Sequence, residues 1–229
     1  MNVLNEFSQI KEVAIRSPLS GFIDDEKLST EWEALRFHSK PDLNQATIEY
    51  NYFRDLLQDD GINIIDLPSS KLLTIDSIYT RDSILISQEG LILCNMGRSS
   101  RTPEAMENFN TLTSQGYEIA GQIEAPGTLE GGDFIWIDDH HAAVGHGPRT
   151  NAEGIRQLKE ILGSSVELHV VMLPEPKHPD DVLHLMSIIS PLDKDLALIY
   201  KPFMPISFLN WLSNLGIKFV EVSENEYPL

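Results

Sequence analysis

The sequence predicts an α/β propeller built from repeated units of strand, strand, helix and strand. Four helix-like segments end at a glycine that precedes a strand-like run. These glycines, Gly61, Gly116, Gly163 and Gly216, are separated by 55, 47 and 53 residues. A period near fifty residues is typical of a repeat architecture such as a propeller, in which each unit forms one blade. We therefore expect one domain over residues 1–229, with units at roughly 12–68, 69–123, 124–174 and 175–223 and an incomplete last blade.

Each glycine fits the position just after a helix, where a left-handed residue closes the last turn. The second helix has an expected N-cap at Thr102, with Pro103 and Glu104 in its first turn. The expected helices span about 43–57, 103–114, 151–162 and 205–215. The expected strands span 12–16, 77–87, 90–95, 133–137, 142–145, 182–190 and 196–200, with one more after each of the four glycines.

The composition is strongly acidic and excludes several classes of partner. Asp and Glu number 35 against 17 Lys and Arg, for a net charge of -18, which repels nucleic acids and anionic membranes and favours small cations. A single cysteine excludes an internal disulfide framework and a cysteine-based zinc cage. The chain has no signal-peptide pattern at its start and no apolar stretch near the ~18 residues of a membrane span. We expect a cytoplasmic protein without a cofactor.

Three polar clusters carry the residues of a candidate site. They are DSIYTRD at 76–82, LEGGD at 129–133 and HLMS at 184–187, each placed before the first long strand of its own unit. In a closed ring the same part of each unit points at the central axis, so Asp82, Glu130 and His184 are expected to lie together. Two carboxylates and a histidine could hold and protonate a cationic, amidine-like group.

Other interpretations of these residues stay open. Taken singly, the aspartates could cap turns, the two glycines of LEGGD could form a tight turn, and His184 could be an ordinary core histidine. A metal site is a second possibility, but neighbouring histidines on a strand point apart, which favours a polar hairpin turn and no metal. The residues concerned are Asp138, Asp139, His140, His141 and His146. The third possibility is a propeller that serves only as a platform for protein interactions and carries out no chemistry.

Five strings in order along the chain resemble a known superfamily. They are DSIYTRD, SSRTPE, TLEGGDFIWID, GPRTNAEGIRQL and VLHLMSIISPLDKDLALIY. The sequence resembles the guanidino-group-modifying superfamily of dimethylarginine dimethylaminohydrolases, arginine deiminases and amidinotransferases, and is most similar to bacterial dimethylargininase-like hydrolases. The resemblance covers Lys11 to Pro228. It implies a pentein-type propeller of five ββαβ blades with an axial site, and hydrolysis of a C–N bond in a small cationic guanidino compound such as a methylated arginine.

The resemblance also implies roles for individual residues. Asp82 would hold the substrate guanidinium, because carboxylates form strong paired hydrogen bonds with this planar cation. Glu130 would assist at the same group, and His184 would act as general acid and base, since its proton exchanges near neutral pH. Arg149 would pair with a substrate carboxylate and Arg101 would also face the substrate. Asp76, at the start of the first cluster, is likewise implied to bind substrate.

Two departures from the superfamily pattern limit what is expected. Arg81 precedes Asp82, as in deiminases and amidinotransferases, but Met186 stands where arginine deiminases carry an aspartate that clamps the guanidinium.

The sequence ends at Leu229, about fifty residues short by the resemblance and by one repeat period, so the module that would carry the nucleophilic cysteine is missing from it. Cys94, among apolar neighbours in GLILCNMG, is expected to be buried and unreactive. We therefore expect either a hydrolase at the family level whose nucleophile is missing from this chain, or a non-catalytic protein that binds guanidino compounds. An incomplete ring predicts one of three outcomes: a homo-oligomer such as a dimer, a rearranged N-terminus that covers the gap, or poor solution behaviour.

Overall fold

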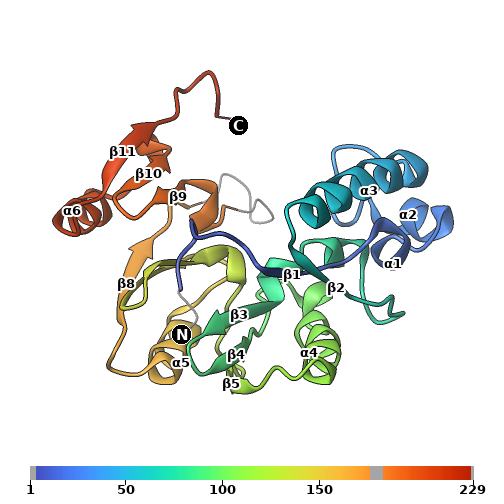
Figure 1. The fold of residues 1–229 in the computed structure, drawn as a ribbon, viewed down its shortest axis with the longest axis horizontal. Helices are drawn as coiled ribbons and strands as arrows, with labels where there is room; N and C mark the ends of the chain where they lie inside the picture. The colour runs from blue at the N-terminus through green and yellow to red at the C-terminus, as the bar shows by residue number, and fades with distance from the viewer. Residues whose placement is uncertain (1–3, 176–182, 228–229) are drawn as a thin grey trace.

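The computed structural model describes residues 4–175 and 183–227, and their strands form four sheets that follow one another along the chain (Figure 1). The first sheet has two parallel strands, β1 (Glu12–Ile15) and β2 (Asn63–Asp66). The other three sheets have three strands each. Together with the helices between the strands, they make a mixed α/β fold.

The three larger sheets share one topology. In each, the first two strands form an antiparallel hairpin, and the second strand pairs in parallel with the third. The strands are β3 (Ile84–Ser87), β4 (Gly90–Leu93) and β5 (Ile119–Gln122); β6 (Phe134–Asp138), β7 (His141–His146) and β8 (Glu167–Met172); and β9 (Ile189–Asp193), β10 (Leu196–Ile199) and β11 (Lys218–Glu221).

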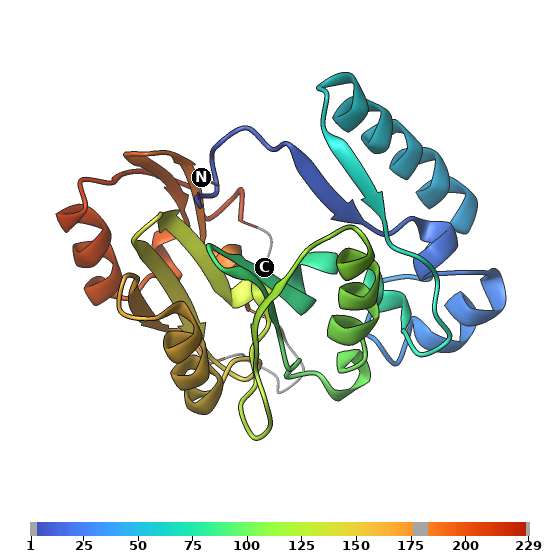
Figure 2. The ribbon, with the colours of Figure 1, turned by 60° about the horizontal axis from the view of Figure 1, so that its bottom comes forward.

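One helix of nine or more residues lies between the parallel strands of each sheet (Figure 2). These helices are α3 (Leu43–Asp59), α4 (Glu104–Ser114), α5 (Ala152–Leu162) and α6 (Ile206–Asn214). All four were predicted from the sequence, with ends that differ by two residues or fewer. Two short helices, α1 (Pro18–Gly21) and α2 (Asp25–Glu31), were not predicted. The closure of the sheets into a ring, and their division into blades of one domain, stay predictions.

The four helix-ending glycines have the left-handed backbone expected of them. Their φ angles are 77°, 92°, 72° and 84° for Gly61, Gly116, Gly163 and Gly216. The expected cap of α4 is wrong, however. The helix is preceded by Pro103, which offers no side-chain cap, and the Thr102 hydroxyl donates instead to the carbonyl of Ser99 at 3.0 Å.

The first strand of each larger sheet begins later than predicted. The polar clusters that precede these strands form 3₁₀ turns, at Ile75–Ile78 and Thr80–Ser83, Gly131–Asp133, and Leu185–Ser187. A 3₁₀ turn is short and tightly wound, so it reverses the direction of the chain just before the strand. The start of the predicted strand at 182–190 lies partly outside the described residues.

The strands β6 and β7 are buried on both faces of their sheet, whereas β8 is partly exposed. Side chains alternate along β6, so Phe134 and Trp136 pack in one apolar cluster while Ile135 and Ile137 pack in another. The first cluster includes residues of the preceding sheet, and the second includes residues of the following sheet. This packing explains the unbroken apolar run in β6 and joins three consecutive sheets into one body.

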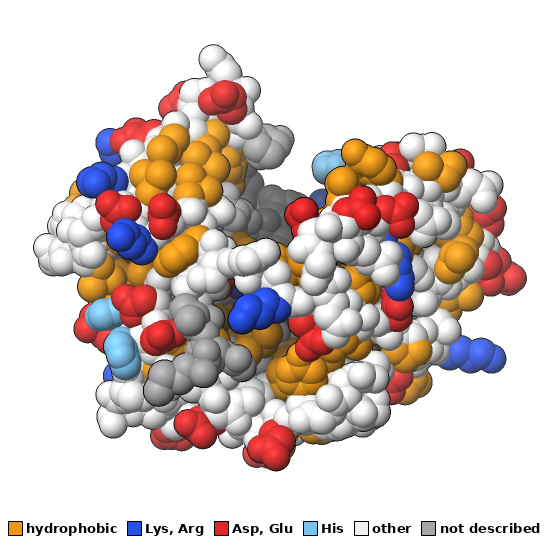
Figure 3. All heavy atoms as spheres, viewed as in Figure 1, with side chains coloured by type: hydrophobic (Ala, Val, Ile, Leu, Met, Phe, Trp, Pro, Cys, Tyr) orange, Lys and Arg blue, Asp and Glu red, His pale blue; other side chains and the backbone are white. Residues whose placement is uncertain are grey.

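The exposed surface reflects the acidic composition. In Figure 3, acidic side chains are spread over the visible face and basic ones are fewer. Among the described residues, no helix combines the length and the apolar character required to cross a membrane.

Candidate active site

Three of the 3₁₀ turns bring the predicted residues together. The turn Thr80–Ser83 contacts the turn Gly131–Asp133, which in turn contacts Leu185–Ser187. One ligand-type atom from each of Asp82, Glu130 and His184 lies within 4.8 Å of the other two. The convergence predicted from the phase of the repeats is therefore present in the structure, although the roles of these residues stay predictions.

Glu130 is the centre of this group and is completely buried. Its Oε1 accepts hydrogen bonds from the backbone N–H of Arg98 at 3.0 Å and from Nη1 of Arg149 at 3.1 Å. Its Oε2 lies 3.1 Å from Nε2 of His184. A buried carboxylate is costly unless it is paired and hydrogen-bonded, and here two cationic side chains and one backbone N–H satisfy it.

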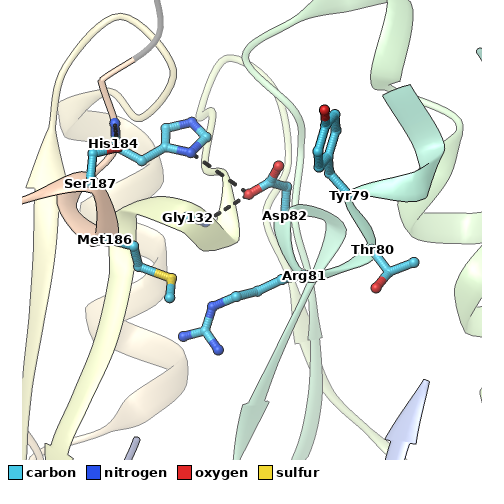
Figure 4. A pocket seen from close by; sticks show the side chains of 8 residues that line it. All are labelled: Tyr79, Thr80, Arg81, Asp82, Gly132, His184, Met186 and Ser187. Atoms are coloured by element: carbon cyan, nitrogen blue, oxygen red, sulfur yellow. Dashed lines mark hydrogen bonds and ion pairs between the residues drawn. The ribbon is translucent and has the colours of Figure 1, made fainter. Parts of the chain in front are cut away.

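Asp82 lies beside His184 and is held from two sides (Figure 4). Its Oδ1 accepts the backbone N–H of Gly132 at 3.0 Å and lies 3.8 Å from Nδ1 of His184. Its Oδ2 accepts Nη1 of Arg101 at 2.7 Å. The two carboxylates therefore contact opposite nitrogens of the same imidazole ring.

Arg101 lies behind Asp82 and is paired with two carboxylates. It is buried, and its guanidinium donates to both oxygens of Glu104 at 2.8 Å, to Asp82, and to the carbonyl of Tyr79 at 3.0 Å. With its donors directed at these groups, the side chain supports Asp82 from within the protein. The expectation that Arg101 faces the substrate stays a prediction.

Gly132 allows His184 to approach. A Cβ atom at this position would lie 2.1 Å from Nδ1 of His184 and 2.9 Å from Oδ1 of Asp82. Any other residue would therefore displace the imidazole or the carboxylate. A tight turn was one interpretation of the glycine pair in the sequence. In the structure, the space that a side chain of residue 132 would fill is occupied by the His184 ring.

The electrostatic environment favours a charged carboxylate and a protonated imidazole. Burial raises the pKa of Glu130, but the hydrogen bond with His184, the charge of Arg149 and the Arg98 N–H together lower it to about 2. Burial lowers the pKa of His184, but the hydrogen bond to Glu130 and the charges of Asp133, Asp82 and Glu130 outweigh it, so this pKa lies above its usual value. Histidine and glutamate therefore form an ion pair over a broad pH range.

The two remaining predicted residues lie around this centre. Arg149 is paired with Glu130, and Asp76 is buried and accepts Nη1 of Arg98 at 2.9 Å. Burial raises the pKa of Asp76, with the charge of Arg98 acting in the opposite direction. Sequence reasoning missed Arg98, although it directly precedes the SSRTPE string. It also gave no role to Asp133, which ends the LEGGD cluster.

A cavity of about 360 Å³ lies beside the charged group. Figure 4 shows Asp82 and His184 on its wall, and Tyr79, Thr80, Arg81, Gly132, Met186 and Ser187 complete the lining. Arg81 is paired with Glu6 from the N-terminal segment at 2.9 Å. Only Asp82 and His184 of the predicted site residues line this cavity, while Glu130 contacts His184 from behind.

The spacing of the three central residues is also compatible with a bound cation. Within residues 4–175 and 183–227, Asp82, Glu130 and His184 are the one group with suitable atoms close together. Their oxygens are already satisfied by Arg101, Arg149 and backbone N–H groups, so we assign no metal to them. The rival cluster forms a turn between β6 and β7, in which Asp138 accepts the backbone N–H groups of His140 and His141 and contacts the His141 ring.

Cys94, the only cysteine of the sequence, lies in the apolar core. Burial, together with the nearby charges of Asp82 and Glu130, raises the pKa of its thiol well above the usual value. A thiolate is the reactive form of cysteine. Cys94 is therefore not placed or ionised as a nucleophile.

Repeated α/β units thus bring two carboxylates and a histidine together from three successive sheets. A model of the family described as "N,N dimethylarginine dimethylhydrolase, eukaryotic" matches residues 28–227. The chain belongs to this family, within the superfamily that also holds arginine deiminases and amidinotransferases.

Relatives and solved structures agree with this assignment. The N(G),N(G)-dimethylarginine dimethylaminohydrolase of Pseudomonas aeruginosa is 34% identical over 139 residues, which cover 58% of this chain and 54% of that protein. The chain thus spans about half the length of the curated relatives it matches. A crystal structure of a dimethylarginine dimethylaminohydrolase adduct with 4-chloro-2-hydroxymethylpyridine matches with a TM-score of 0.71 and 27% identity, over 96% of this chain and 78% of that one. The structure of a cysteine-to-serine mutant of the Pseudomonas aeruginosa enzyme with citrulline matches with a TM-score of 0.68 and 25% identity. The match covers 96% of this chain and 94% of that one.

Proposed function

We propose that the site binds the guanidino group of an arginine-like compound such as methylated arginine. The observation that carries this proposal is the pair of carboxylates, Asp82 and Glu130, held on either side of His184 in a protein of net charge -18. A guanidinium is a planar cation with several N–H donors, and carboxylates bind it through charge-assisted hydrogen bonds. Arg149 would then exchange its contact with Glu130 for the carboxylate of the ligand.

For the whole protein we propose the hydrolysis of a guanidino C–N bond. In this reaction the bond to the leaving amine breaks, water supplies the oxygen of the resulting ureido group, and the amine departs with an added proton. His184 is suited to deliver that proton, because its raised pKa favours the protonated imidazole. Asp82 and Glu130 would stabilise the cation and orient the imidazole.

The position of Cys94 favours a second candidate for the 229 residues themselves. A covalent mechanism requires an activated nucleophile, and this buried thiol does not provide one. Binding of a guanidino compound without turnover is therefore the alternative function. A propeller that acts only through protein partners is the third candidate, and it predicts that the charged site has no effect on ligand binding.

We also propose that the four sheets are blades around an axis on which the site lies. Three of them repeat one strand order, and the turns that carry Asp82, Glu130 and His184 precede the first strand in each. The sheet β1–β2 has two strands where the others have three, so it is the incomplete blade of this arrangement. The incomplete last blade expected from the sequence stays a prediction.

Titration calorimetry with dimethylarginine tests the binding function. We expect binding by the unaltered chain and at least about tenfold weaker binding by Asp82→Asn, since a charge-assisted hydrogen bond is lost. Asp138→Asn, at an exposed acidic position on β6, is the matched control and should bind normally. Equal affinity for Asp82→Asn and the control would contradict the proposal. Release of dimethylamine by the 229-residue chain would rule out binding without turnover.

A further inference from the structure

Asp133 is a buried carboxylate to which the proposed chemistry gives no role. Only 1% of its surface is exposed. Its Oδ1 accepts the backbone N–H of Leu185 at 3.1 Å, and its Oδ2 accepts the hydroxyl of Thr150 at 2.7 Å. The same hydroxyl oxygen accepts the backbone N–H of Glu130 at 3.2 Å.

These contacts connect the two halves of the site. Leu185 directly follows His184, so the first contact fixes the backbone of the turn that carries the imidazole. The second contact runs through Thr150, which is also completely buried, to the backbone of Glu130. The turns Gly131–Asp133 and Leu185–Ser187 precede strands of different sheets. One side chain therefore fixes His184 relative to Glu130 across two structural units.

The charge of Asp133 acts on the same imidazole. The titratable groups that face His184 are Asp82 from the turn before β3, and Glu130 and Asp133 around the turn before β6. Arg149 and Arg101 lie on the far side of Glu130 and Asp82. These two arginines offset part of the negative charge of their partners. Within the described part of the chain, Asp133 accepts a hydroxyl and a backbone N–H, and the charge of His184 acts on its carboxylate.

We infer that Asp133 is a positioning residue of this site, which holds His184 and Glu130 at hydrogen-bond distance and supplies negative charge beside the imidazole. It acts through these two residues and not on the ligand. The inference rests on the proposed function only where ligand binding is measured. The effect of Asp133 on His184 is a property of the ligand-free protein.

The test compares Asp133→Asn with Asp138→Asn, which removes an exposed carboxylate from the same strand region. The imidazole of His184 is followed by NMR over a pH titration of the free protein, and dimethylarginine binding is measured by calorimetry. We expect Asp133→Asn to lower the pKa of His184 and to weaken binding about tenfold, a loss typical of one charge-assisted contact. Asp138→Asn should change neither. An unchanged His184 titration in folded Asp133→Asn would overturn the inference.

A second variant covers the case in which Asp133→Asn does not fold. Thr150→Val has nearly the same shape and removes the hydroxyl that joins Asp133 to the backbone N–H of Glu130. We expect dimethylarginine binding to weaken by about threefold or more, because both hydrogen bonds of this link are lost. The carboxylate of Asp133 itself remains in this variant. Normal binding by Thr150→Val would overturn the positioning role. A failure of the proposed function is distinguishable, because the unaltered chain would then not bind dimethylarginine at all.

Discussion

The chemistry of the site depends on a histidine enclosed by three carboxylates. Asp82, Glu130 and Asp133 surround His184, and their combined charge outweighs the effect of burial on its pKa. Burial raises the pKa of Asp133 itself to about 6, against the opposing charge of His184 and the bonds from Thr150 and Leu185. Glu130, Asp133 and His184 are therefore expected to titrate as a coupled unit.

The pairing of Glu130 makes a prediction about acid stability. Because its pKa is about 2 in the folded protein, against 4.5 for an ordinary glutamate side chain, folding favours the charged form. The stability from this group is complete above pH 4.5 and is lost as the pH falls toward 2, and the shift corresponds to about 3 kcal/mol.

The variant Glu130→Gln should lack this loss. Denaturant unfolding at a series of acidic pH values is the measurement, and the unaltered chain should lose more stability on acidification than the variant. The exposed Glu124→Gln is the control and should follow the unaltered chain. Parallel pH profiles for the Glu130 variant and the unaltered chain would show that this carboxylate is not selectively stabilised in its charged form.

Replacing Gly132 tests the close packing of the His184 ring on the backbone. Gly132→Ala places a Cβ 2.1 Å from the His184 ring, so we expect weaker dimethylarginine binding, by about tenfold or more, together with reduced stability. Gly116→Ala is the control, because its Cβ would meet no atom within 4 Å and its cost is backbone strain of about 1 kcal/mol at a positive φ. Calorimetry and thermal unfolding measure the two effects. Equal binding by both variants would contradict the packing of His184 on Gly132.

At the scale of elements, periodic sequence patterns predicted the long helices well, whereas the short helices and the 3₁₀ turns were not predicted. The helices α3 to α6 and the glycines that end them follow from apolar periodicity and from the need for a left-handed residue, both of which are local in sequence. The helices α1 and α2 are too short to show a helical period. The segment before β3 has apolar residues that suggest a strand, but it forms 3₁₀ turns whose direction is set by contacts with the neighbouring unit.

For the site, the sequence predicted which three central residues meet but not the side-chain contacts around them. The shared position of three polar clusters in their units predicted that Asp82, Glu130 and His184 would meet. The pairing of Arg101 with Glu104, of Asp76 with Arg98, and of Asp133 with Leu185 depends on side-chain directions in three dimensions. No spacing in the sequence distinguishes an arginine that faces a ligand from one that supports a carboxylate.

The cap of α5 gives a prediction for a single element. The side chain of Asn151 accepts the N–H of Gly154 at 2.8 Å and the N–H of Thr128 at 3.0 Å, so it joins the helix start to the segment before Glu130. We expect Asn151→Ala to cost about 1–2 kcal/mol of unfolding free energy. Asn110→Ala on α4, which is not a cap, serves as the comparison in the same denaturant experiment. A loss no larger than that of Asn110→Ala would contradict the capping role.

At the scale of the whole molecule, the net charge of -18 should act on the ligand before it reaches the site. An acidic surface raises the local concentration of cations, and salt screens this effect over about 10 Å at 0.1 M. We expect the affinity for dimethylarginine to fall by about threefold when salt rises from about 0.05 M to about 0.5 M. Binding of neutral citrulline, measured in the same buffers, should change less. An affinity for dimethylarginine that is independent of salt would contradict this long-range contribution.

The crystal structure of the protein with dimethylarginine is the most direct test of guanidino binding at this site. We predict density for the guanidinium next to the carboxylates of Asp82 and Glu130, within hydrogen-bond distance of at least one of them, and with the His184 ring still in contact with Glu130. A ligand bound elsewhere, while this site keeps the Glu130 contacts with Arg149 and His184 unchanged, would contradict the assignment.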